Sequence, residues 1–120
     1  MGLKKIGDIV SITPTSDHLG YWLVNSAGGV YAFNDAVFYG NLIGTGSKVV
    51  GLEPTADGRG YWMFTKTGSV QGFGDAVFYG DLATTNVTGM AVTADGGGYW
   101  LTTSKGIVDA FGDAVFYGDV

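Results

Sequence analysis

The stretch Gly20-Tyr21-Trp22-Leu23 is the most informative part of the chain, because it returns twice almost unchanged. A second stretch, Asp35-Ala36-Val37-Phe38-Tyr39-Gly40, returns twice without any change. Internal repeats with a period of about 40 residues are typical of propellers and other architectures built from copies of one supersecondary unit. The sequence therefore predicts a single domain of three units, at about residues 1–42, 43–82 and 83–120. The later copies of the two stretches are Gly60-Tyr61-Trp62-Met63, Gly98-Tyr99-Trp100-Leu101, Asp75–Gly80 and Asp113–Gly118.

The composition excludes several classes of protein. Hydrophobic residues make up 46% of the 120 residues and charged residues only 14%, which is the reverse of the balance in disordered chains. The formal net charge of −5 argues against a nucleic-acid binder, which needs a basic face. The chain has no Cys, so disulfides and thiolate metal sites are excluded.

The residues between the turn signals predict four short strands in each unit. β-branched and aromatic residues fill these segments, whereas Gly, Asp, Asn and Ser fill the gaps. Because the gaps are short, consecutive strands are expected to be antiparallel. In the first unit the expected strands are Ile9–Thr13, Tyr21–Asn25, Val30–Phe33 and Val37–Tyr39. Their equivalents are 49–52, 61–65, 70–73 and 77–79 in the second unit, and 87–92, 99–103, 108–111 and 115–117 in the third.

These strands are expected to be covered on both faces. A strand with one solvated face alternates apolar and polar residues, but 21–24 and 37–39 are apolar at both parities. Four-stranded antiparallel sheets of about 40 residues that pack face to face describe β-propeller blades. The small residues Ser11, Gly51 and Gly89 suit a crowded innermost strand. A β-trefoil monomer is the alternative fold, since it also uses three four-stranded units.

The repeat itself is similar to a known one. Gly-Tyr-Trp-Leu-Val, a Gly-rich turn, Val-Tyr-Ala-Phe and Asp-Ala-Val-Phe-Tyr-Gly follow one another over residues 20–40. This combination, present in all three units, resembles the Gly- and aromatic-rich repeats of secreted actinobacterial proteins. The resemblance implies a β-propeller in an extracellular or cell-wall-associated setting, and it implies no reaction, because no catalytic residue belongs to the repeat. The chain departs from that family in having only three copies, and it has Asn34 where its other units have Gly74 and Gly112.

The repeated aromatic residues are the candidate ligand-binding residues. The tryptophans could stack on sugar rings, but their place in the middle of an apolar strand favours packing between units. We expect Trp62→Ala to be the most damaging of the three Trp truncations, because both faces of the middle unit are covered within one chain. The tyrosines stand before a Gly at the end of the fourth expected strand, where their hydroxyls could reach a pocket between units. The two sets are Trp22, Trp62 and Trp100, and Tyr39, Tyr79 and Tyr117.

No cofactor, metal site or catalytic residue is predicted. Asp17, Asp57 and Asp95 lie in turns, where a carboxylate can bond nearby backbone N–H groups. The oxygen ligands of a calcium loop are not spaced in this way. The loops after the second and fourth expected strands vary between units, whereas the other loops are nearly invariant. Function is often carried by variable loops on a rigid scaffold, so the rim with the variable loops is the predicted binding face.

The predicted function is a non-enzymatic binding or scaffold module, lectin-like in its repeated aromatic residues. The alternatives are an engineered or fragmentary propeller without a ligand, and an enzyme directed at glycosides, which would need paired carboxylates across units. Expected partners are the chain itself and cell-wall or other glycans, with no nucleic acid and no membrane. Residues 1–8 contain two lysines without a following apolar stretch, so no signal peptide is predicted.

Self-association follows from counting units. Propellers close with about 4–8 blades, so three units leave a ring open and two apolar faces bare. Head-to-tail contact between two chains would close a six-bladed homodimer, with a nine-bladed homotrimer as the alternative. In that ring the segment Met1–Asp8 is expected to link neighbouring units, with Leu3 in the place of Leu42 and Leu82.

Overall fold

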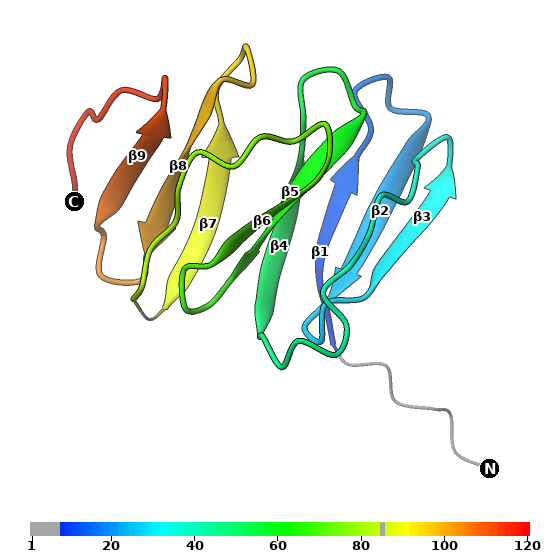
Figure 1. Cartoon of the computed structure of the whole chain (residues 1–120), viewed down its shortest axis with the longest axis horizontal. Helices are drawn as coiled ribbons and strands as arrows, with labels where there is room; N and C mark the ends of the chain where they lie inside the picture. The colour runs from blue at the N-terminus through cyan, green and yellow to red at the C-terminus, as the bar shows by residue number, and fades with distance from the viewer. Residues whose placement is uncertain (1–7, 85) are drawn as a thin grey trace.

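A computed structural model describes residues 8–84 and 86–120, and it contains strands and no helix within those ranges (Figure 1). The strands form three separate antiparallel sheets, ordered β1-β2-β3, β4-β5-β6 and β7-β8-β9. The all-β, three-unit organisation predicted from the repeats is therefore confirmed. The strands are β1 (Ile9–Pro14), β2 (Gly20–Asn25), β3 (Val30–Asn34), β4 (Val49–Pro54), β5 (Gly60–Thr65), β6 (Val70–Gly74), β7 (Val87–Val92), β8 (Gly98–Thr103) and β9 (Val108–Gly112).

The same local features recur in each unit. The first strand of every sheet carries a register shift after its first residue, at Ile9/Ser11, Val49/Gly51 and Val87/Gly89. Asn34 has φ 56°, close to the 66° and 67° of Gly74 and Gly112 at the same position. Asn tolerates the left-handed region better than most residues with a Cβ. The departure of Asn34 from the repeat is therefore accommodated without a change in the backbone.

The expectation of a fourth strand in each unit is wrong. Val37–Tyr39, Val77–Tyr79 and Val115–Tyr117 lie outside the three sheets. Side chains bond the backbone of this segment where a strand would bond to a neighbour: the indole Nε1–H of Trp22 donates to the carbonyl of Val37 at 2.8 Å. Each unit is thus a three-stranded sheet followed by an extended segment that crosses one of its faces.

The three sheets stand side by side, with their first strands next to one another (Figure 1). The hydroxyl of Thr13 in β1 donates to the carbonyl of Leu52 in β4 at 3.0 Å, which joins two units. A Cβ on Gly51 would lie 2.9 Å from the ring of Phe64, which explains a small residue in this strand. In the described residues no strand ladder runs from one unit to the next, so the units do not form the single barrel of a trefoil. The arrangement is blade-like.

Two apolar clusters form the core, and both lie between units. We call the side of a unit that carries Trp22, Trp62 or Trp100 its trailing face, the opposite side its leading face, and the contact between two units a junction. At the first junction Trp22 and Val24 pack against Leu52, Tyr61 and Met63 of the next unit. At the second, Trp62 and Phe64 pack against Tyr99 and Leu101.

The tryptophans differ in burial because each one faces the following unit. Trp22 and Trp62 are both 1% exposed, so burial does not distinguish these two side chains. Trp100 is only half-buried, since no described residues of another unit pack on its face. The expected packing of Leu3 lies outside the described residues.

Candidate functional site

Each junction is organised around one tyrosine hydroxyl. Tyr61, which is 0% exposed, accepts hydrogen bonds from the backbone N–H groups of Tyr39 and Gly40, both at 3.0 Å. The same hydroxyl donates to the carbonyl of Gly40 at 2.5 Å. One side chain of the second unit therefore holds the extended segment of the first.

The second junction repeats this arrangement. The Tyr99 hydroxyl accepts from the N–H of Tyr79 at 3.1 Å and donates to the carbonyl of Gly80 at 2.6 Å. Trp62 meets Tyr99 edge-on, with ring centroids 5.6 Å apart and planes at 64°. The Trp22–Tyr61 pair is almost the same, at 5.7 Å and 72°. Contact geometry is therefore a property of the repeat and not of one junction.

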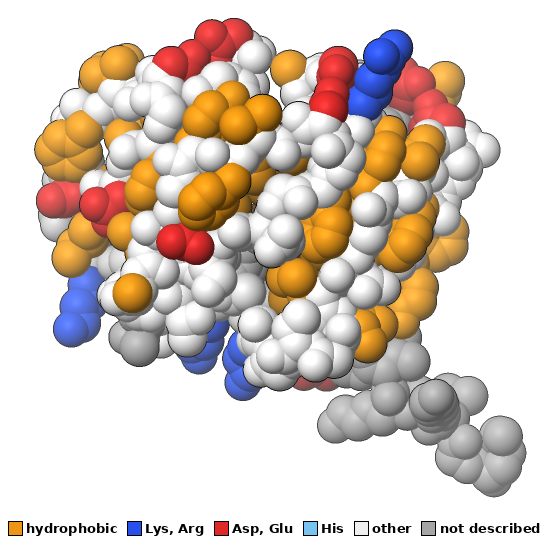
Figure 2. Space-filling model, viewed as in Figure 1, with side chains coloured by type: hydrophobic (Ala, Val, Ile, Leu, Met, Phe, Trp, Pro, Cys, Tyr) orange, Lys and Arg blue, Asp and Glu red, His pale blue; other side chains and the backbone are white. Residues whose placement is uncertain are grey.

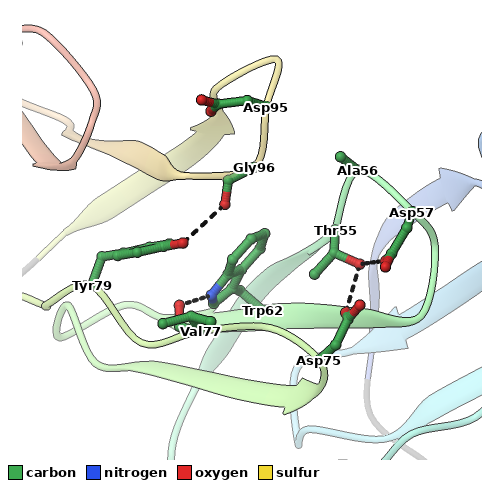
Figure 3. Close-up of a pocket in the computed structure, with 9 residues that line it drawn as sticks. All are labelled: Thr55, Ala56, Asp57, Trp62, Asp75, Val77, Tyr79, Asp95 and Gly96. Atoms are coloured by element: carbon green, nitrogen blue, oxygen red, sulfur yellow. Dashed lines mark hydrogen bonds between the residues drawn. The ribbon is translucent and has the colours of Figure 1, made fainter.

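A pocket of about 290 Å³ opens beside the second junction (Figure 3). Figure 3 shows Thr55, Asp57 and Asp75 on one side of it, and the Tyr79 hydroxyl bonded to the carbonyl of Gly96 on the other. Trp62 lies between them and donates from Nε1 to the carbonyl of Val77 at 2.7 Å. An equivalent pocket of about 130 Å³ lies at the first junction, lined by Thr15, Ser16, Asp17, Trp22, Asp35, Asp57 and Gly58.

Paired carboxylates give these pockets their chemistry. The Thr55 hydroxyl lies 2.8 Å from Asp57 and 3.0 Å from Asp75, so its single proton links the two side chains. The contact with Asp75, together with the Arg59 N–H, holds the pKa of Asp57 at about 2. The same contact with Asp57 raises the pKa of Asp75. Asp75 therefore keeps its proton to a higher pH than Asp57, and both can accept hydrogen bonds from ligand hydroxyl groups.

The Thr–Asp–Asp group occurs in all three units. Thr15 bonds Asp17 and Asp35 at 2.7 and 3.2 Å, and Thr93 bonds Asp95 and Asp113 at 2.9 and 3.0 Å. We call the edge of the molecule that carries these groups the acidic rim. The sequence signal for the group is a Thr five residues before each Gly-Tyr-Trp, which the sequence reasoning did not use.

Four of the six sequence-predicted tyrosines and tryptophans, Trp22, Tyr39, Trp62 and Tyr79, lie at the junctions. Trp22 and Trp62 are too buried to offer a ring face to a sugar. The Tyr39 and Tyr79 hydroxyls reach the next unit, each donating to a turn carbonyl at 3.2 Å, that of Gly58 or Gly96. In the third unit Tyr117 is 85% exposed and Trp100 is half-buried. The structure thus brings Trp22 and Tyr39 into one apolar cluster and Trp62 and Tyr79 into the other.

The variable loops lie on the opposite rim, which we call the lysine rim after Lys48, Lys66 and Lys105. In the view of Figure 2 several acidic side chains lie along the upper edge, with others at the left and in the middle, and most basic ones lie along the lower edge. A hollow of about 600 Å³ on the lysine rim is lined by Lys48 and Lys66 with Asp8, Ser26 and other residues at the starts of β1, β4 and β7. The aromatic residues and the variable loops therefore belong to opposite rims, a separation that the sequence reasoning missed.

The two outer faces of the molecule are bare. On the leading face of the first unit Ile12 is 63% and Tyr21 42% exposed, whereas their equivalents Leu52 and Tyr61 are 0% exposed. Phe33 on that face is also exposed. The trailing face of the third unit presents Trp100 and Tyr117. The residues on each bare face are therefore equivalent to residues that are buried at the junctions inside the chain.

Comparison of the chain with models of protein families and with curated proteins gives no match. The part of the chain that the structure describes contains no helix that could cross a membrane. Within that part, no three side chains of His, Cys, Asp or Glu gather as ligands for a metal ion.

Proposed function

We propose that the chain is a non-enzymatic scaffold of β-propeller type that assembles head to tail with copies of itself. The observation that carries this proposal is the contrast between bare and covered copies of one face. Ile9, Ile12 and Tyr21 are 42–63% exposed, while the same positions in the second and third units are largely or completely buried. Monomeric proteins seldom expose a large contiguous apolar patch. A second copy is the occupant that already has the complementary face.

The repeat specifies the contacts of the new junction. Tyr21 would take the part of Tyr61, accepting from the N–H groups of Tyr117 and Gly118 in the second copy and donating to the carbonyl of Gly118. The Tyr117 hydroxyl would donate to the carbonyl of His18, as Tyr39 does to that of Gly58. Trp100 would meet the edge of Tyr21. Every group in this junction has an observed precedent at the two junctions inside the chain.

Ring closure sets the number of chains. A head-to-tail contact is heterologous, so it repeats until the rotation closes. Two chains supply six units, which lies within the usual range of about 4–8 propeller blades. Six is therefore the proposed count, and three chains with nine units form the alternative ring.

Light scattering after size-exclusion chromatography tests the assembly. The wild-type chain should show about twice its mass of 12.5 kDa. Ile12→Lys places a charge on the bare leading face and should give the mass of one chain. Ile43→Lys is the matched control, because Ile43 is 59% exposed in a loop, against 63% for Ile12. A wild-type monomer at all concentrations, or equal masses for the two variants, would overturn the proposal.

Carbohydrate binding at the junction pockets is the second candidate function. The specific observation is the Thr55–Asp57–Asp75 group at the wall of a pocket of about 290 Å³. Carboxylates that accept hydrogen bonds, placed beside apolar walls, suit a ligand rich in hydroxyl groups. The resemblance to repeats of secreted proteins supports glycans, including those of cell walls, as the ligands, and an extracellular location.

A glycan screen followed by calorimetry tests this second function. Asp75→Asn should weaken binding, while Asp109→Asn, which changes a carboxylate on β9 away from the pocket, should not. Hydrolysis of the bound glycan is not expected, because the proposal is non-enzymatic. Failure of every glycan to bind, or release of cleaved sugar, would count against it.

A further inference from the structure

One turn position distinguishes the junction between chains from those within a chain. Gly58 and Gly96 have φ of 73° and 72°, in the left-handed region that favours glycine. His18 occupies the same position in the first unit, with φ 61°. It is the only histidine of the chain. His18 therefore carries a side chain in a backbone conformation that favours glycine, and its turn belongs to the bare leading face.

The geometry of the second junction shows where a side chain at this position points. A Cβ built on Gly96 would lie 3.5 Å from the Cβ of Ala56 and 3.7 Å from its backbone nitrogen, both ordinary contact distances. Figure 3 shows Ala56 at the mouth of the pocket, between Thr55 and Asp57. At the first junction a Cβ on Gly58 would meet nothing within 4 Å, although Gly58 lines the pocket there together with Asp17 and Asp35. The position thus borders the acidic turn of the preceding unit, and it has room for a side chain.

The same relation can be carried to the junction between chains. Ala94 of the third unit is the equivalent of Ala56, and it lies between Thr93 and Asp95. Thr93 bonds both Asp95 and Asp113. Tyr117 is free to donate to the His18 carbonyl, which would hold the turn in place as at the other junctions. The imidazole would therefore stand against two carboxylates of the second copy.

We propose that His18 of one copy completes the acidic pocket of the third unit of the next copy, and that its protonation strengthens the assembly. This inference rests on the proposed head-to-tail association. The charged groups around the imidazole are Asp17 from its own turn, and Asp95 and Asp113 of the second copy. The equivalent pocket at the first junction contains no basic side chain that would oppose the imidazolium.

The sign of the effect follows from the order of titration. Imidazoles gain a proton between about pH 8 and pH 5, whereas carboxylates mostly stay ionised until about pH 4. The Gly97 N–H and Asp113 lower the pKa of Asp95, whereas Asp95 raises the pKa of Asp113. Between pH 7.5 and 5.5 an imidazolium is therefore introduced against the Asp95 carboxylate, which remains charged. An exposed ion pair changes an equilibrium by about 1.4- to fivefold. A closed two-chain ring has two such junctions, so the dissociation constant should fall about two- to twenty-five-fold.

Analytical ultracentrifugation at pH 7.5 and 5.5 tests the inference on the full chain. His18→Gly restores the residue of the other two units and removes the backbone conflict, so it should fold and associate without this pH dependence. His18→Gln keeps a side chain but gains no charge, and it should behave in the same way. Asp95→Asn should reduce the effect from the opposite side of the junction. Glu53 also titrates in this range, but any contribution from it remains in the His18 variants.

The outcomes separate the two proposals. Tighter wild-type association at pH 5.5 that is lost in His18→Gly and His18→Gln supports the inference. Association whose pH dependence is the same in these variants overturns the role of His18 and leaves the head-to-tail assembly standing. A wild-type chain that stays monomeric at both pH values overturns the assembly and, with it, this inference.

Discussion

Replacing Tyr61 with Phe removes one oxygen atom and three hydrogen bonds. The Tyr39 and Gly40 N–H groups and the Gly40 carbonyl all lose their partner. An unpaired backbone group away from water costs about 1–3 kcal/mol. These three groups are only part-buried, so water replaces some of the lost bonds. We expect the free energy of unfolding to fall by about 3 kcal/mol, a large part of a typical total of about 5–15 kcal/mol.

Tyr21→Phe is the matched control. The side chain occupies the same place in the repeat, but it is 42% exposed, and no described residue bonds its hydroxyl. In urea, where unfolding free energy changes by about 1–3 kcal/mol per molar, Tyr61→Phe should lower the midpoint by at least about 1 M. Tyr21→Phe should leave the midpoint nearly unchanged at low protein concentration. Unfolding is monitored by tryptophan fluorescence. Equal urea midpoints for the two variants would refute the importance of the junction hydroxyl.

Three further predictions concern packing, charge and backbone, and urea unfolding checks each. Trp62→Ala should cost about 3–5 kcal/mol, and Trp100→Ala clearly less, because no unit covers Trp100; similar losses would contradict the burial argument. Burial raises the pKa of Glu53 from 4.5 to about 6. Protonation of Glu53 therefore stabilises the folded state, and this contribution is complete below pH 4.5 and is lost as the pH rises through 6. Glu53→Gln should therefore stabilise the fold by about 1 kcal/mol at pH 7.5 and leave it unchanged at pH 4; a loss at pH 7.5 would show that the charge is favourable. Gly80→Ala puts a Cβ 2.7 Å from the Phe111 ring, whereas Gly118→Ala meets nothing within 4 Å, so only the first should lower the midpoint strongly.

The strands of each sheet could be predicted because their signals are local. β-branched and aromatic residues at 20–25, 30–34 and their equivalents are separated by Gly- and Asp-containing turns, and those turns close in every unit by the same hydrogen bonds. At these turns the hydroxyl of Thr15 accepts a hydrogen bond from the backbone N–H of Gly20. The hydroxyls of Thr55 and Thr93 donate to Asp75 and Asp113. Their role is visible in the sequence as a repeated spacing.

The extended segment could not be predicted correctly from its composition. Val37, Phe38 and Tyr39 have high strand propensity, but propensity describes fit to a half-buried surface and not a hydrogen-bonding partner. The partners here are Trp22 of the same unit and Tyr61 of the next, and each is at least 15 residues away in the chain. Side chains that bond a backbone from such a distance leave no pattern within the segment itself.

The sequence by itself determined that one unit occurs three times, that each unit is β-rich, and that both faces of its sheet are apolar. Only the tertiary structure decided which face meets the following unit. Successive residues of a strand alternate between the two faces of its sheet. Because both faces are equally apolar, the repeat does not indicate whether Trp22 or Tyr21 faces the following unit. In the structure Trp22 and Trp62 face the next unit, where they pack against Tyr61 and Tyr99. That direction leaves Tyr21 bare at one end of the molecule and Trp100 at the other, and so determines which surfaces are left to join.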